Sequence, residues 1–190
     1  MPKAKLVPKA KKKKRWFTVL APSIFRSAEI GHVLAFEPNN LIGRVIKADC
    51  GQLTGSPRDQ SKKVSLKIKE VSGDRALTEA TSFFLLDNWV ARMTRGYKEK
   101  FICVTKSPSR DKRIIKTKLL FLLKSGIHRG VKSEIIKRSE QFVRDQCAKT
   151  TTQELFALEF TEKLAATLKR ELRTVYPIDR INVWKLSIVA

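Results

Sequence analysis

The chain has 190 residues, and its 40 lysines and arginines against 18 aspartates and glutamates give a net charge of +22. The length suits one sizeable domain with a tail, and an apolar fraction of 42% is too high for a wholly disordered chain. No run of about 18 apolar residues is present to span a bilayer, so we expect no membrane partner, and a positive excess this large indicates a polyanionic one.

The first 15 residues form a basic tail without a single acid, since Glu29 is the first acidic residue of the chain. Low hydrophobicity with high net charge cannot offset the entropy lost on ordering. We therefore predict a disordered arm over residues 1–15 that folds onto its partner, followed by a single domain over residues 16–190.

The first half of this domain shows mainly strand patterns. Residues 16–20 and 41–48 are apolar enough to predict strands, and residues 27–34 between them predict a short helix. Residues 64–71 alternate between apolar side chains and lysines, and the turn signal Ser72-Gly73-Asp74 predicts a hairpin with the strand that follows.

The second half begins with a change to helical spacing over residues 85–96. Residues 100–106 and 113–124 then predict a second antiparallel pair around Ser107-Pro108-Ser109.

After Gly126 the pattern becomes helical, with a capping box at residues 151–154 opening one helix and Pro177 ending the region. Residues 178–189 predict a closing strand. The order of elements favours an α+β fold, with a mostly antiparallel sheet or a barrel flanked by helices.

Catalytic and metal-binding patterns are absent from the sequence. It contains no GxSxG, GxxxxGK[ST], HExxH or GxGxxG, and Cys50, Cys103 and Cys147 form no CxxC pair. We therefore expect no enzyme activity, no cofactor and no metal. His32 and His128 are interpreted as surface or packing residues, and the sparse thiols indicate a reducing, cytoplasmic compartment.

The cations are better organised, because they gather in the tail, on strand faces and after Ser125. Phosphates neutralised by such clusters release counterions and give strong, salt-sensitive binding. RNA is favoured over DNA because no recognition-helix pair, zinc finger or basic zipper is present. The predicted RNA-binding residues are Lys3, Lys5, Lys9, Lys11, Lys12, Lys13, Lys14, Arg15, Trp16, Lys62, Lys63, Lys67, Lys69, Lys112, Arg113, Lys116, Lys118, Lys124, His128, Arg129 and Lys132.

The aromatic residues near the basic clusters have two interpretations. Trp16 and Phe17 either stack on bases or anchor the first strand, and Trp89 falls on the apolar face of its predicted helix. The expected mode is therefore recognition of phosphates and folded RNA shape, with little reading of bases.

Four segments, in this order, resemble the archaeal and eukaryotic small-subunit ribosomal protein family S3Ae, also called eS1: KKKKRWFTVLAPSIF, LIGRVI, QLTG and VYPIDRINVWKL. The resemblance covers nearly the whole chain. It implies a structural component of the small ribosomal subunit, built around a mixed barrel with helices, on the platform near the messenger RNA exit.

The same resemblance implies small-subunit rRNA and neighbouring ribosomal proteins as partners, and messenger RNA near the exit site as a further one. Because this chain stops at Ala190, soon after the last predicted strand, an archaeal or reduced member is expected. A free-standing RNA-binding chaperone or translation regulator is the main alternative, and a nucleic-acid-processing enzyme is a weaker one.

Overall fold

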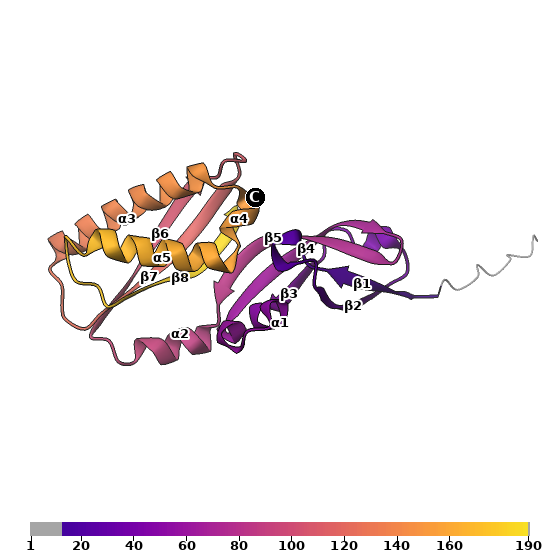
Figure 1. Cartoon of the computed structure of the whole chain (residues 1–190), viewed down its shortest axis with the longest axis horizontal. Helices are drawn as coiled ribbons and strands as arrows, with labels where there is room; N and C mark the ends of the chain where they lie inside the picture. Colours follow the sequence, from indigo (N-terminus) through magenta and orange to yellow (C-terminus); the bar gives the residue numbers. More distant parts are fainter. Residues whose placement is uncertain (1–12, 190) are drawn as a thin grey trace, which may run out of the picture.

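The computed structural model describes residues 13–189, which form eight strands and five α-helices (Figure 1). The strands are β1 (Arg15–Leu20), β2 (Glu29–Ala35), β3 (Val45–Asp49), β4 (Lys62–Ser72), β5 (Arg75–Leu85), β6 (Glu99–Pro108), β7 (Ile114–Leu123) and β8 (Arg180–Val189). The helices are α1 (Cys50–Thr54), α2 (Asp87–Thr94), α3 (Arg129–Lys149), α4 (Thr152–Leu155) and α5 (Leu158–Leu172). Most of the predicted arm, residues 1–12, lies outside the described residues.

All eight strands belong to one sheet, and the long strand β5 joins its two parts. One edge of β5 pairs with β4. Its other edge is shared, because β1 pairs with its beginning in parallel and β8 pairs with its end antiparallel. From the end of β5 the sheet continues through β8, β7 and β6, and from its beginning through β1 and β2; on the opposite edge, β4 is followed by β3.

Helices α3 and α5 cover one face of the β6–β7–β8 part of the sheet (Figure 1). A continuous row of buried side chains lies under this layer, because cross-strand partners share a face of a sheet. This row comprises Thr105, Thr117, Leu186, Phe83, Val64 and Ala48, each paired with the next across six strands. All six are at most 3% exposed, so this face is the core face.

The buried apolar residues form two clusters, a large one under the helices and a small one around Phe17 and Leu41. Both clusters draw on the same two strands, since Ile68 and Ala76 belong to the small cluster and Leu66 and Ala80 to the large one. Because β4 and β5 pass through both, we propose that residues 16–190 form a single domain.

The helix predicted over residues 27–34 is wrong, because this segment forms β2 and pairs with β1 from Arg15 to Leu20. Gly31, with φ of +152°, lies opposite Val19 where the register shifts by a bulge. The backbone groups at the edge of β1 need hydrogen-bond partners, and pairing with β2 supplies them. This contact outweighs the weak local helix preference of so short a segment.

Two further expectations are corrected. The strand predicted over residues 41–48 begins only at Val45, because Leu41 turns into the small core and Gly43 takes a φ of +87°. The sheet remains open over the described residues, so the barrel alternative, which the family resemblance also implied, is not observed.

The remaining predicted elements are confirmed, including both hairpins, the helices after Gly126 and the closing strand. Thr151 and Glu154 form the predicted capping box. Phe17 is 2% exposed and anchors β1, and Trp89 packs against the large core. All three cysteines are free and buried, which makes them core thiols.

Candidate nucleic-acid interface

The face of the sheet opposite α3 and α5 carries a row of lysines and small hydroxyl residues. The row crosses six strands through paired residues, in the order Lys106, Lys116, Ser187, Ser82, Ser65 and Lys47. It contains three cations and no acid. Because its members alternate along each strand with the buried row, they project to the side away from the helices.

A second row runs beside the first, with the order Val104, Lys118, Lys185, Phe84, Lys63 and Asp49. Its one acid, Asp49, already pairs with Lys63 at 3.1 Å. We call the surface formed by the six lysines of the two rows the basic sheet face: Lys47, Lys63, Lys106, Lys116, Lys118 and Lys185.

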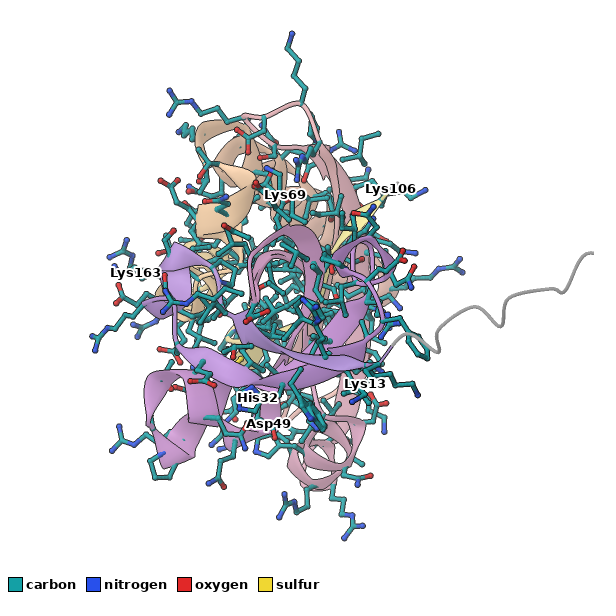
Figure 2. All side chains as sticks on the ribbon, turned by 90° about the vertical axis from the view of Figure 1, so that its right-hand side faces the viewer. Lys13, His32, Asp49, Lys69, Lys106 and Lys163 are labelled. Carbon is teal, nitrogen blue, oxygen red and sulfur yellow. The ribbon has the colours of Figure 1, made fainter. Side chains whose placement is uncertain are left out.

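The basic sheet face and the helical layer lie on opposite sides of the molecule. In Figure 2, Lys106 of β6 projects on the right and Lys163 of α5 on the left. The two sides differ in charge balance. Residues 98–128, which contain β6 and β7, hold nine basic and two acidic residues, whereas residues 129–172, which contain α3 to α5, hold nine and seven. A polyanion is therefore attracted mainly to the sheet side.

Apart from Lys62, the sequence-predicted residues that the structure describes divide into three groups in space. The structure brings Lys63, Lys116 and Lys118 together on the basic sheet face, and Lys112 and Arg113 lie in the turn that joins β6 to β7. Two groups lie elsewhere. The residues at or near the start of α3 are Lys124, His128, Arg129 and Lys132, and those of the β1–β2 side and the far end of β4 are Lys13, Lys14, Arg15, Trp16, Lys67 and Lys69.

Sequence reasoning missed half of the basic sheet face, namely Lys47, Lys106 and Lys185. A signal for them existed, since Lys106 and Lys47 alternate with buried neighbours along their strands. The face on which a single lysine of an apolar strand lies can be assigned only once the strand's partners are known. The sequence did not indicate that β3, β6 and β8, which carry these lysines, belong to one sheet.

Several predicted cations are engaged by acids within the fold. The pairs are Lys62 with Asp59 and Glu162, Arg113 with Glu79, Lys124 with Asp179, and Lys132 with Glu99. An ion pair reduces the charge that a residue offers to phosphate, so these side chains contribute less to an RNA footprint than the lysines of the first row.

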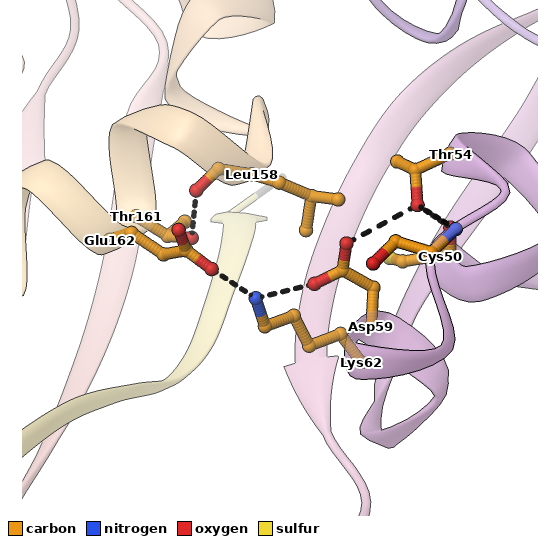
Figure 3. A network of polar contacts seen from close by, with 8 residues as sticks. Cys50, Thr54, Asp59, Lys62, Leu158, Thr161 and Glu162 are labelled. Atoms are coloured by element: carbon orange, nitrogen blue, oxygen red, sulfur yellow. Dashed lines mark hydrogen bonds and ion pairs between the residues drawn. The ribbon is translucent and has the colours of Figure 1, made fainter.

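Lys62 is the most enclosed of them and joins the helical layer to the β-strands (Figure 3). Its Nζ donates to Asp59 Oδ1 at 2.8 Å and to Glu162 Oε1 at 2.6 Å, and its side chain is only 15% exposed. Burial disfavours the ammonium group, but the hydrogen bonds to Asp59 and Glu162 outweigh burial and raise the pKa of Lys62. This lysine therefore has a structural role in the fold.

Replacing Lys62 by methionine is expected to lower the free energy of unfolding by about 1–2 kcal/mol, because Asp59 and Glu162 lose their shared donor. Since the folded-state pKa is raised, this stabilisation is present below the unfolded pKa of lysine and is lost as pH rises through the folded pKa. Urea unfolding at neutral pH measures it.

The control is Lys163→Met, because Lys163 is 77% exposed and, within residues 13–189, its ion-pair partner is the exposed Glu159 alone. It should change stability by less than about 0.5 kcal/mol. Equal effects of the two substitutions would show that the Lys62 contacts contribute nothing specific.

Trp16 and Phe17 occupy opposite faces of β1. Phe17 lies in the small core, whereas Trp16 is 66% exposed beside the basic residues at the end of the arm. Lys14 Nζ lies 5.2 Å from the centroid of the nearby Phe36 ring. Trp16 is thus placed where a ligand of the arm could reach it, and Phe17 is not.

Among residues 13–189 there is no group of three metal-ligating side chains, and none of the helices there is long and apolar enough to cross a membrane. Burial, reinforced by Asp59, raises the pKa of the Cys50 thiol to about 12, so Cys50 stays protonated and unreactive at neutral pH.

A comparison with known protein families shows which family the chain belongs to. The model of the ribosomal S3Ae family matches residues 3–190. The chain belongs to this family.

The chain aligns with curated relatives over most of their length. The small ribosomal subunit protein eS1 of Picrophilus torridus is 27% identical over 178 residues, which is 94% of this chain and 85% of the relative. Those of Natronomonas pharaonis and Halorubrum lacusprofundi are 28% and 29% identical, and each alignment covers 97% of this chain and 89% or 86% of the relative.

Membership of the S3Ae family confirms the family that the sequence resembled. In this member, the lysines of the basic sheet face are held by consecutive pairings across six strands, so their spacing is set by the sheet.

Proposed function

We propose that this protein is a structural component of the small ribosomal subunit in the cytoplasm and that it binds small-subunit rRNA through the basic sheet face and the arm. The observation that carries the proposal is the pair of lysine rows, in which the only acid is neutralised by its neighbour Lys63. A rigid array of cations with few acids fits the sugar–phosphate backbone of folded RNA. The proposal includes no catalytic role.

The surface of α3 to α5 fits a different kind of partner. Its nearly balanced charges, nine basic against seven acidic residues in residues 129–172, resemble the mixed composition of protein–protein interfaces. We assign this surface to neighbouring ribosomal proteins. The position on the platform near the messenger RNA exit, with messenger RNA as a further contact, remains part of the proposal on the strength of family membership.

Sedimentation of a cell lysate with immunodetection tests the proposal directly. The protein should migrate with small ribosomal subunits, and release by nuclease should follow digestion of the rRNA. A protein that sediments mainly as free chains would instead favour a free-standing RNA chaperone or translation regulator.

Deleting residues 1–14 should weaken binding to small-subunit rRNA and leave the folded body intact. The deletion removes seven lysines, and the slope of log affinity against log salt should fall by about 0.7–0.9 for each phosphate that is no longer neutralised. Filter binding at several salt concentrations measures the slope, and thermal unfolding monitors the body. A large fall in unfolding temperature would contradict the interpretation of residues 1–14 as an arm.

A further inference from the structure

A hollow of about 370 Å³ opens at the centre of the basic sheet face. Its walls combine two aromatic rings, three lysines and one carboxylate, and small serine side chains from β4 and β5 form part of its floor. The rings, lysines and carboxylate belong to Lys47, Phe84, Asp87, Lys118, Trp184 and Lys185. The half-buried rings of Phe84 and Trp184 therefore offer stacking surfaces beside the lysines.

A β-bulge in β8 explains how Trp184 reaches this hollow. Lys118 pairs with Lys185 and Leu119 pairs with Val183, so Trp184 is the extra residue. Val183 and Leu186 on either side are buried, whereas Trp184 is half-buried and Lys185 is exposed. The bulge therefore turns two consecutive side chains, Trp184 and Lys185, to the same face, as such irregularities do near binding sites.

Each ring has a lysine beside it. Lys118 Nζ lies 5.6 Å from the centroid of the Trp184 ring, and Lys47 Nζ lies 5.9 Å from that of Phe84. These distances are within the range of cation–π attraction, which holds both ammonium groups near the rings. A nucleotide stacked on either ring would place its phosphate near an ammonium group.

Asp87, the first residue of α2, is the only acid that lines the hollow. It shows no ion pair among the described residues, and its side chain is exposed at the rim. A carboxylate there repels phosphate but accepts hydrogen bonds from the exocyclic amino group of a base, as in the pairing of acids with cytosine.

We propose that this hollow holds one unpaired nucleotide of the rRNA, with its base against Phe84 or Trp184, its phosphates near the lysines and an exocyclic amino group at Asp87. The inference rests on the proposed function and adds to it a site that reads a base. It also revises the expectation of little base reading, because the sequence did not indicate that Phe84 and Trp184 would meet.

Fluorescence anisotropy with labelled oligocytidine and oligouridine tests the site in the full-length chain. The two bases differ at the group that Asp87 would contact, so the wild-type protein should bind oligocytidine about 3- to 10-fold more tightly. The double substitution Phe84→Leu with Trp184→Leu should weaken oligocytidine binding by about tenfold or more, because base stacking is removed, and should leave the salt slope unchanged.

Three matched variants complete the test. Trp184→Phe keeps a ring and should bind within about twofold of the wild type, which separates stacking from loss of fold. Leu77→Ala removes an exposed apolar side chain of β5 outside the hollow and should change nothing. Asp87→Asn should abolish the preference for cytidine over uridine, because an amide both donates and accepts hydrogen bonds.

The proposal is overturned if the wild type shows no preference for oligocytidine, if the double variant binds oligocytidine as the wild type does, if Leu77→Ala weakens binding equally, or if Asp87→Asn keeps the preference. Its failure is distinguishable from failure of the proposed function. If removing lysines of the basic sheet face still weakens rRNA binding and lowers the salt slope, only the nucleotide site is wrong.

Discussion

Replacing Leu168 by alanine should lower the free energy of unfolding by about 2–5 kcal/mol. Leu168 lies on α5 and is 0% exposed within the large core. The substitution removes buried apolar atoms and leaves a cavity under the helical layer. Urea unfolding monitored by circular dichroism measures the change, with the slope against urea unchanged.

Leu77→Ala is the matched control, because it makes the same chemical change at a position that is 44% exposed on β5. It should cost less than about 1 kcal/mol. If Leu168→Ala cost no more than Leu77→Ala, α5 would not be packed on the sheet as described. Such a result would also remove the argument that the basic sheet face lies opposite a helical layer.

The second large effect concerns RNA. Replacing Lys106, Lys116 and Lys118 together by alanine should lower the affinity for small-subunit rRNA by about 10- to 100-fold near physiological salt. All three side chains lie on the basic sheet face and none has an ion-pair partner among the described residues. The slope of log affinity against log salt should fall by about 2, since the variant no longer neutralises three of the phosphates.

The control for this triple variant removes three exposed lysines from the helical layer, at Lys137, Lys149 and Lys163. It makes the same change in net charge. If the footprint is on the sheet, the control should lose less than about threefold in affinity and keep most of the slope. Equal losses from the two triple variants would show that the RNA senses only total charge, and the assignment of the interface to the sheet would be wrong.

Short-range patterns in the sequence were sufficient to predict most of the helices and strands. The alternation in residues 64–71 and in the first half of residues 113–124 identified strands with one mostly buried and one cationic face, because a strand has a period of two; from Leu119 to Leu123 both faces of β7 are buried. Thr151 and Glu154 identified a helix start, because their side chains satisfy backbone groups locally. Each of these signals is complete within a few residues.

The segment after Ser27 shows where local patterns fail. Whether residues 29–35 form a helix or a strand depends on the open edge of β1, which a reading of the segment does not reveal. Similarly, Lys62 resembled any other surface lysine until Glu162, 100 residues away, was found beside it. Contacts between distant segments decide both cases.

Composition was enough to indicate a polyanionic partner, since the net charge of +22 persists in any fold. The four family-like segments and their order along the chain indicated the family without coordinates. Locating the proposed interface required the folded chain. Lys47 and Lys106 are 59 positions apart, and they share one row only because six strands pair in register between them. The hollow also depends on the bulge in β8 that turns Trp184 to the same face as the lysines. This bulge is a shift in the pairing of β8 with β7, so it exists only in the folded sheet.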